Sequence, residues 1–448
     1  MVLRFGTDGV RGVANTELTP SFALDLGRAA ARVLRVTDMV VGRDTRRSGP
    51  MLQAAFASGL ASEGVTVHLL GVVPTPTVAH LAARKGFAGA VISASHNPFA
   101  DNGIKLFAAG GTKLADEVEA EIESAMATLS TPTSTGADVG QIIDAAEMTS
   151  QYLDHVIAAV TPGGLRGLSV VLDTGHGASS GLAGAIYRAA GADTEVIFDE
   201  PDGVNINAGC GATHPEDLRR IVVDRGAMLG LAFDGDADRL IAVDHTGSIV
   251  DGDHVMAILA LDMLARGVLH HDTVVVTVMT NLGFRLAMTD AGIKVVETGV
   301  GDRYVLQALD EGGYSLGGEQ SGHVIFRDLA STGDGMLTGL MLAEVVARSG
   351  QSLADLADMA MTRLPQVLLN YRMVERDPLL LDRLRPDVEA AEAELGDRGR
   401  ILVRASGTEP LIRVMVEAFD ADVAKRCAVG LIAKIETFDR QTNAGISR

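Results

Sequence analysis

The sequence predicts an α/β protein, with three similar mixed α/β/α domains followed by a smaller C-terminal α+β domain. Two observations predict this fold class. First, an apolar strand, a loop, a helix and a second strand follow one another in the same order three times. Second, this pattern stops after about residue 365, where strands joined by a polar loop precede a helical segment. The length of 448 residues fits roughly two to four domains.

Each of the three repeats is a strand–helix–strand unit. In each one the helix ends near a glycine (Gly64, Gly191 or Gly292), and alternating apolar residues then enter the second strand. Such units form mostly parallel sheets with helices on both faces, so three of them predict three α/β domains. The repeats are residues 38–72, 169–200 and 273–300.

The segments outside the repeats predict the domain boundaries and the content of the tail. Residues 127–140 are rich in Ser, Thr, Gly and Pro, which is typical of a loop near a boundary. In the tail, apolar patterns at 367–374 and 400–419 predict strands, and residues 421–438 predict a helix. The expected domains are residues 1–150, 151–250, 251–365 and 366–448.

Composition narrows the classes of protein to which the chain can belong. The net charge of −20 disfavours nucleic acid as a partner, because binding its phosphates requires a basic surface. Two cysteines without CxxC spacing argue against a disulfide framework or a zinc site. The N-terminus lacks the apolar region of a signal peptide, and Asp262 interrupts the best candidate for a membrane span. We therefore expect a cytoplasmic protein with no membrane partner.

The most specific motif is a group of three carboxylates that follows an apolar strand, Asp234, Asp236 and Asp238. Carboxylates two residues apart on a loop repel one another unless a cation lies among them, and their oxygens suit Mg²⁺ or Ca²⁺. A calcium-binding EF-hand loop does not fit, because Arg239 stands where Gly is required and His245 where Glu is required. An acidic turn is the alternative, and a Mg²⁺ site used with a phosphate is the prediction.

Two further loops carry groups that recognise phosphates or sugars. Arg404, Ser406, Gly407 and Thr408, with Arg413 nearby, offer guanidinium, hydroxyl and amide donors to one oxyanion, although a plain hairpin loop has a similar composition. The second loop presents a carboxylate, a hydroxyl and an imidazole, which suit the hydroxyls or amine of a sugar, with an ordinary polar loop as the alternative. Its residues are Glu319, Ser321 and His323.

A serine–histidine pair, Ser95 and His96, follows a short apolar run, and Pro98 then ends regular structure. A serine in this position can be a nucleophile, a helix cap or turn filler. Lys105 lies on the same loop, and Arg11 lies in a glycine-containing loop near the N-terminus. Taken alone, these residues leave the role of Ser95 open.

Five motifs in their order along the chain resemble the α-D-phosphohexomutase family. They are FGTDGVRG at 5–12, SASHNP at 93–98, DGDADR at 234–239, GEQSGH at 318–323 and RASGTEP at 404–410. The resemblance runs nearly end to end, without a departure at a position whose role the family defines. It implies four domains around a central cleft, which carry in turn the phosphoserine loop, the metal-binding loop, the sugar-recognition loop and the phosphate-binding loop.

The resemblance also implies an activity. Ser95 would carry a phosphoryl group, give it to one end of a hexose monophosphate, and recover a phosphoryl group from the other end of the resulting bisphosphate. The motif at 318–323, supported by LIRVMVE at 411–417, resembles the members that interconvert glucosamine 6-phosphate and glucosamine 1-phosphate. That isomerase reaction feeds UDP-N-acetylglucosamine and cell-wall precursor synthesis. A hexose 1,6-bisphosphate activator is implied, and a homodimer is left open.

Roles follow for the individual residues. The catalytic group would be Ser95, His96, Lys105 and Arg11. One Mg²⁺ would be bound by a phosphate oxygen on Ser95 and by Asp234, Asp236 and Asp238. Arg239 would hold the transferring group, Glu319, Ser321 and His323 the sugar, and the following residues the phosphate that is not reacting: Arg404, Ser406, Gly407, Thr408 and Arg413.

Three other functions remain as alternatives. Within the family, the alternative is a phosphomannomutase/phosphoglucomutase. From another class, a phosphoserine beside Mg²⁺ could pass the phosphoryl group to water, which would make the protein a Mg²⁺-dependent sugar phosphatase. A non-catalytic phosphosugar-binding protein is weakened as an alternative because Ser95 and the three aspartates are all present.

Overall fold

The computed structural model describes residues 3–6, 8–132, 134–374, 377, 379–405 and 410–446, with side chains up to residue 441. The chain divides into two compact units. The larger unit comprises Met1–Met279 and Ala291–Ala360, and the smaller unit comprises Thr280–Asp290 and Met361–Arg448.

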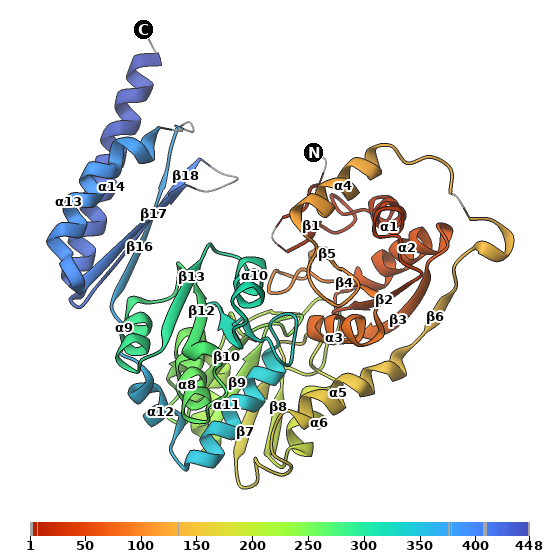
Figure 1. Ribbon diagram of the computed structural model, residues 1–448, viewed down its shortest axis with the longest axis horizontal. Helices are drawn as coiled ribbons and strands as arrows, with labels where there is room; N and C mark the ends of the chain where they lie inside the picture. Colours follow the sequence, from red (N-terminus) through yellow and green to blue (C-terminus); the bar gives the residue numbers. More distant parts are fainter. Residues whose placement is uncertain are drawn as a thin grey trace. The chain divides into compact units, whose positions relative to one another are not determined.

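The first sheet of the larger unit has six strands in the order β1-β5-β4-β2-β3-β6 (Figure 1). Its strands are β1 (Val10–Val13), β2 (Asp38–Arg43), β3 (Thr66–Val72), β4 (Ala88–Ile92), β5 (Asp101–Phe107) and β6 (Ile142–Asp144). Strand β2 pairs in parallel with β3 and β4, whereas β5 runs antiparallel to β4 and β1. The loop between β4 and β5 carries Ser95.

Helices cover both faces of this sheet. They are α1 (Pro20–Leu34), α2 (Gly49–Ser62), α3 (Thr75–Lys85) and α4 (Asp116–Ala127). Successive side chains of a strand point to opposite faces, so Met39 and Val41 pack with α1 and α2 while Val40 packs with α3. These alternating apolar residues place the core on both sides of β2.

The second sheet has five strands in the order β11-β10-β9-β7-β8. Its strands are β7 (Ser169–Asp173), β8 (Asp193–Ile197), β9 (Leu229–Phe233), β10 (Leu240–Asp244) and β11 (Ile249–Val250), and its neighbouring helices are α5 (Thr149–Ala158), α6 (Ala183–Ala189) and α7 (Glu216–Arg225). Strand β9 is buried along its whole length and ends immediately before Asp234. A fully buried strand therefore fixes the start of the aspartate motif.

The third sheet has the order β13-β12-β14-β15. It contains β12 (Thr273–Thr277), β13 (Lys294–Thr298), β14 (Leu316–Gly318) and β15 (Val324–Phe326), with α8 (Gly252–Ala265), α10 (Asp302–Gly312), α11 (Gly335–Ser349) and α12 (Leu353–Ala360) in the same segment of chain. Strands β14 and β15 form an antiparallel hairpin, and its turn is residues 319–323. The predicted sugar-recognition residues thus lie at one end of a rigid hairpin.

The smaller unit is built on an antiparallel sheet in the order β16-β18-β17. Its elements are α9 (Leu282–Asp290), β16 (Gln366–Arg372), α13 (Leu380–Leu395), β17 (Gly399–Ala405), β18 (Leu411–Ala418) and α14 (Ala421–Ile446). Glu417 joins α9 to the sheet, because its carboxylate accepts hydrogen bonds from the backbone N–H of Leu282 (2.9 Å) and from Arg400 (2.8 Å). Short 3₁₀ turns in the chain are Gly136–Asp138, Ala146–Met148, His270–Asp272 and Gly396–Arg398.

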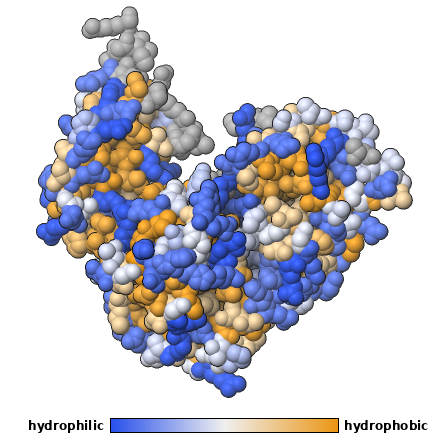
Figure 2. All heavy atoms as spheres, viewed as in Figure 1, coloured by the Kyte–Doolittle hydropathy of each residue, from blue (hydrophilic) through white to orange (hydrophobic). Residues whose placement is uncertain are grey.

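The predicted α/β fold class is confirmed by this architecture. Each of the three repeats forms a parallel pair of strands, β2 with β3, β7 with β8, and β12 with β13. Hydrophilic residues are interspersed with apolar ones over the visible face (Figure 2). No helix among the described residues has both the length and the apolar character that a membrane span requires.

Candidate active site

Ser95 lies in the loop between β4 and β5 with only 1% of its surface exposed. Its φ of 51° falls in the left-handed region, which non-glycine residues occupy mainly at functional sites or tight turns. The Ser95 Oγ donates a hydrogen bond of 2.5 Å to Oδ2 of Asp234, a residue 139 positions away. The fold therefore brings the predicted serine and the predicted metal-binding motif together.

The three aspartates form a compact buried cluster on the loop between β9 and β10. One carboxylate oxygen from each of Asp234, Asp236 and Asp238 lies within 4.8 Å of the others. Burial, followed by the charges of Asp238 and Asp236, raises the pKa of Asp234. The Oδ1 atoms of Asp236 and Asp238 are buried without a hydrogen-bond partner. A buried cluster of three carboxylates, two of which also have an unpartnered oxygen, fits the oxygen-ligand chemistry of Mg²⁺.

Two elements from outside the second sheet hold this loop in place. At the start of α3, Thr75 donates its hydroxyl to Oδ2 of Asp236 (2.6 Å) and its backbone N–H to the Asp236 carbonyl (2.9 Å). At the start of α11, the backbone N–H of Gly335 donates to the carbonyl of Ala237 (3.0 Å). Ala237 itself has a φ of 55°. The first and third sheets thus contribute helix N-termini that fix the aspartate loop.

Lys105 extends from β5 toward the same aspartates. Its Nζ lies 2.8 Å from Oδ2 of Asp236 and 3.1 Å from Oδ2 of Asp238, and the side chain is buried. Burial alone would lower the pKa of Lys105, but the negative charges of Asp236 and Asp238 outweigh it and raise the pKa above its ordinary value. Lys105 is therefore a fixed positive charge in this arrangement.

His96 has the opposite character. Its Nδ1 lies 3.4 Å from Ser95 Oγ and 3.4 Å from a guanidinium nitrogen of Arg239. Burial, followed by the positive charges of Arg239 and Arg11, lowers the pKa of His96, so the imidazole is neutral near pH 7. The Nε atoms of Arg11 and Arg239 are buried without hydrogen-bond partners. Two guanidinium donors beside Ser95 are thus available to an anion.

The turn between β14 and β15 presents Glu319 and Ser321. The backbone N–H of Gly301 donates to Oε1 of Glu319 (3.0 Å), and the Ser321 hydroxyl donates to Oε2 (3.4 Å). Both side chains are partly exposed, so their remaining hydrogen-bonding capacity faces solvent. Glu319 also contributes to the electrostatic environment of Arg239. The structure thus places this turn close to the residues around Ser95.

His323, at the end of the same turn, is 3% exposed. Its Nδ1 lies 3.8 Å from Oδ1 of Asp238, and its Nε2 accepts a hydrogen bond of 2.9 Å from the backbone N–H of Gly333. Burial alone would lower the pKa of His323, but its interaction with the Asp238 carboxylate raises it. The ring therefore contacts the aspartate loop and has little surface left for a sugar.

In the smaller unit, Arg404 on β17 and Arg413 on β18 lie directly opposite each other. Burial, followed by the charge of Arg413, lowers the pKa of Arg404. Like charges opposite each other on neighbouring strands are destabilising, which makes this pair suited to an anion. The predicted partners Ser406, Gly407 and Thr408 lie outside the described residues.

Several residues outside the predicted set also support the site. Arg46 and Asn207 contact the backbone carbonyl of Ser95, and Thr75 holds Asp236. Lys113 bridges Asp8 (3.1 Å) and Asp302 (2.7 Å). The sequence does contain one signal for Arg46, a run of charged residues immediately after the apolar strand at 38–43. The other contacts join distant segments through single polar side chains.

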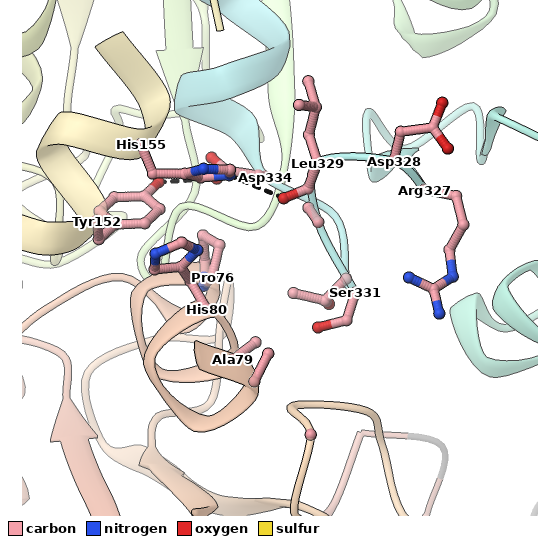
Figure 3. A pocket seen from close by; sticks show the side chains of 14 residues that line it. Pro76, Ala79, His80, Tyr152, His155, Arg327, Asp328, Leu329, Ser331 and Asp334 are labelled. Atoms are coloured by element: carbon pink, nitrogen blue, oxygen red, sulfur yellow. Dashed lines mark hydrogen bonds between the residues drawn. The ribbon is translucent and has the colours of Figure 1, made fainter. Parts of the chain in front are cut away.

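A separate cavity of about 180 Å³ is lined by residues of α3 and α5 and by the segment before α11 (Figure 3). Two hydrogen bonds close one side of it, from Tyr152 Oη to Asp334 (2.8 Å) and between His155 and the carbonyl of Leu329 (2.8 Å). His80 stacks on His155 with a centroid separation of 4.3 Å. The cavity contains no residue predicted for the site, but Asp334 caps α11, whose first residue holds the aspartate loop.

Comparison with known proteins identifies the family. Models of the phosphoglucomutase/phosphomannomutase family match α/β/α domain I at residues 2–133, domain II at 150–247, domain III at 251–364 and the C-terminal domain at 368–434. The chain belongs to this family. The resemblance to phosphohexomutases that the sequence motifs indicated is therefore confirmed.

The chain is similar to named members of the family over nearly its whole length. It is 54% identical to a phosphoglucosamine mutase of Rhodococcus jostii, covering 96% of this chain and 99% of the relative. It is 53% identical to a phosphoglucosamine mutase of Streptomyces coelicolor, covering 97% and 98%. Among solved structures, a phosphoglucomutase/phosphomannomutase family protein from Burkholderia thailandensis superposes with a TM-score of 0.83 at 27% identity, covering 97% of this chain and 98% of that one.

Proposed function

We propose that this phosphohexomutase interconverts glucosamine 6-phosphate and glucosamine 1-phosphate through a phosphoserine at Ser95. The observation that carries this proposal is the 52–54% identity to curated phosphoglucosamine mutases over nearly the full length. It favours the amino-sugar substrate over the mannose and glucose phosphates, and an isomerase over a phosphatase. The product would supply UDP-N-acetylglucosamine and cell-wall precursor synthesis. We propose that the enzyme acts in the cytoplasm, with a homodimer as its candidate oligomeric state.

The reaction is two phosphoryl transfers. In the first, the bond between Ser95 Oγ and phosphorus breaks while a hydroxyl oxygen of the sugar bonds to that phosphorus, and the hydroxyl proton leaves for a base. In the second, the phosphoryl group at the other end of the bisphosphate bonds to Ser95 Oγ as its bond to the sugar oxygen breaks, and that oxygen takes up a proton. Such transfers depend mainly on alignment and on neutralising the transferring oxygens. A hexose 1,6-bisphosphate would first phosphorylate Ser95 as an activator.

The groups around Ser95 suit these tasks. Arg11 and Arg239, whose Nε atoms have no hydrogen-bond partner, would hold the transferring phosphoryl group. His96 is neutral and 3.4 Å from Ser95 Oγ, so we assign it the proton transfer. Lys105 remains charged and would neutralise negative charge beside Asp236 and Asp238, which supports an electrostatic role in preference to that of a base.

We propose Mg²⁺ as the metal, held by Asp234, Asp236, Asp238 and a phosphate oxygen on Ser95. When bound, Mg²⁺ neutralises negative charge on the transferring phosphoryl group. The support is the buried cluster of three carboxylates, together with the Oδ1 atoms of Asp236 and Asp238, which have no hydrogen-bond partner in the described part of the chain. Lys105 donates its hydrogen bonds to the other oxygen, Oδ2, of each of these two residues.

We assign substrate recognition to two groups of residues. We assign Glu319, Ser321 and, with less exposed surface, His323 to the sugar. The remaining phosphate would bind Arg404 and Arg413 together with the loop that joins their strands, which contains Ser406, Gly407 and Thr408. A site that recognises only phosphate can accept the bisphosphate in either orientation, as a reaction at both ends requires.

We also propose that the boundaries between the four domains lie near residues 150, 250 and 365.

The decisive experiment compares kcat/KM for glucosamine 6-phosphate, glucose 6-phosphate and mannose 6-phosphate, with Mg²⁺ and a bisphosphate activator present. The expected result is a clear preference for glucosamine 6-phosphate that disappears in Ser95→Ala. Equal turnover of the neutral sugars would contradict the assignment of Glu319 and Ser321. Inorganic phosphate is measured in parallel, because its release in step with turnover would indicate the phosphatase.

A further inference from the structure

Arg46, in the loop between β2 and α2, is a fully buried arginine with 0% of its surface exposed. A buried guanidinium is costly unless its N–H groups are all hydrogen-bonded. Each of its five N–H donors has an acceptor here. The acceptors are Oδ2 of Asp44 (2.7 Å) and the backbone carbonyls of Ser95 (2.8 Å), Asn97 (2.9 Å), Asp101 (2.9 Å) and Pro98.

The four carbonyls all belong to the segment that begins with Ser95 and ends at the start of β5. A single side chain therefore binds both ends of the serine loop. Only the planar fork of arginine can satisfy this set, because lysine has three donors on one nitrogen. Nothing in the five contacts involves Oγ of Ser95, so Arg46 leaves the reacting atom free.

Asp44, the ion-pair partner of Arg46, fixes the N–H side of Ser95. Asp44 accepts a hydrogen bond of 2.6 Å from Oγ of Ser93, and Oγ of Ser93 accepts one of 2.9 Å from the backbone N–H of Ser95. Ser95 is thus held at its N–H through Ser93 and Asp44 and at its carbonyl by Arg46. Asn207 donates a second hydrogen bond of 2.9 Å to that carbonyl.

These contacts explain how Ser95 keeps its backbone conformation. A non-glycine residue at a φ of 51° is strained by about 1–2 kcal/mol and persists only where its surroundings impose it. Fixing the peptide on both sides of Ser95 aims its Oγ at Asp234, 2.5 Å away.

We infer that Arg46 is a positioning residue for phosphoryl transfer. Its guanidinium, with Asp44 and Ser93, holds Ser95 in the left-handed turn that directs Oγ toward the aspartate cluster. The inference rests on the proposed function, because it concerns transfer at Ser95. It predicts that loss of the fork lowers kcat and leaves sugar-phosphate binding unchanged, since Arg46 is sealed from the substrate.

The test measures kcat, KM, the unfolding temperature and hydrogen exchange of residues 93–103 in Arg46→Lys and Ser93→Ala. Arg47→Ala is the matched control, because Arg47 is adjacent but exposed. Displacement of a reacting group by about 1 Å can cost roughly 10²-fold, so Arg46→Lys should lower kcat about 100-fold with little change in KM. Exchange of residues 93–103 should accelerate while that of β9 does not.

Ser93→Ala keeps the buried ion pair and so should fold even if Arg46→Lys does not. Unchanged kcat or unchanged exchange at 93–103 in a folded variant overturns the inference. The inference is also overturned if kcat returns to the wild-type value at temperatures where the variant is fully folded, because the loss would then come from unfolding. If the wild-type protein isomerises no hexose phosphate, the proposed function fails, whereas the exchange measurement still decides whether Arg46 orders the serine loop.

Discussion

At the residue scale, Lys105 and His96 both interact with the aspartate cluster but differ in charge. The negative charges of Asp236 and Asp238 keep Lys105 protonated, whereas burial and two arginines keep His96 neutral. A base must be able to accept a proton, and a neutral imidazole near Ser95 can do so. Replacing Lys105 and replacing His96 are therefore expected to have different effects on the protein.

We expect Lys105→Met to lower kcat by about 100-fold or more, because two buried carboxylates lose their counter-charge. His96→Gln should lower kcat to a similar extent while leaving the stability of the protein nearly unchanged, since His96 is partly exposed. Steady-state kinetics and thermal unfolding of both variants check this, with the exposed Lys85→Met as control. Full turnover in either variant removes that residue from the proposed mechanism.

A second prediction concerns the arginine pair of the smaller unit. Arg413→Ala should raise KM about tenfold or more in both directions of the reaction, because a charge-assisted hydrogen bond contributes about 1.5–3 kcal/mol. The exposed Arg426→Ala serves as control. A rise in KM confined to one direction contradicts a phosphate site shared by both orientations of the ligand.

The sequence could predict the residues that carry charge or nucleophilicity, because they lie in short contiguous motifs. Ser95 and Asp234 were both expected, although only the structure shows that they contact each other. Arg46 and Thr75 could not be assigned, because they act on residues 49 and 161 positions away. Contacts of this kind depend on tertiary packing, which periodicity and local motifs do not encode.

At the scale of elements, the strand–helix–strand repeats could be predicted because their apolar periods are regular. The antiparallel hairpin of β14 and β15 was not expected, since its strands have only three residues each. The placement of α9 with the smaller unit was also not expected. It depends on Glu417, a buried carboxylate 135 positions away from Leu282. Short strands and single buried ion pairs leave little periodic signal.

The packing of α3 against α5 leads to a prediction about pH (Figure 3). Burial, together with the positive charges of His155 and Arg84, lowers the pKa of His80 to about 4, and its Nε2 has no hydrogen-bond partner. The unfolded chain, with a pKa near 6.5, binds this proton more tightly. His80 therefore contributes stability above about pH 6.5 that is lost as pH falls toward 4.

His80→Phe keeps the ring but removes the proton, so the variant should lose less stability than the wild type between pH 6.5 and 4. Denaturant unfolding at several pH values measures the difference, and taking the difference cancels the carboxylates that titrate in both proteins. Tyr152 and Asp334 also face this region, but the substitution leaves them in place. Parallel pH profiles for the two proteins would show that His80 does not titrate as described.

At the scale of the whole molecule, the protein has 58 acidic residues against 38 lysines and arginines, yet we propose that it binds an anionic substrate. Local charge resolves this contrast. Arg11 and Arg239 interact with His96, the neighbour of Ser95, and Lys105 contacts the aspartate cluster. Their fields act at short range, whereas charges separated by more than about 10 Å are screened at 0.1 M salt. The net charge therefore affects solubility more than the chemistry at the serine.

The aspartate cluster should couple the stability of the folded protein to Mg²⁺. Burial and the charges of Asp238 and Asp236 raise the pKa of Asp234, so its ionised form is unfavourable unless a further cation binds beside it. A ligand that binds only the folded state adds about 2.7 kcal/mol at a hundredfold excess over Kd. We therefore expect Mg²⁺ to raise the unfolding temperature, and EDTA to reverse the change.

Asp234→Asn should separate the two parts of this effect. Asparagine keeps an oxygen that can accept a hydrogen bond from Ser95 but removes one negative charge. The metal-free variant should therefore be at least as stable as the metal-free wild type. Most of the increase in unfolding temperature caused by Mg²⁺ should disappear. Calorimetry at constant ionic strength measures both quantities, with the exposed Asp224→Asn as the control for nonspecific binding. An equal gain with Mg²⁺ in Asp234→Asn would place the stabilising ion elsewhere on this acidic protein.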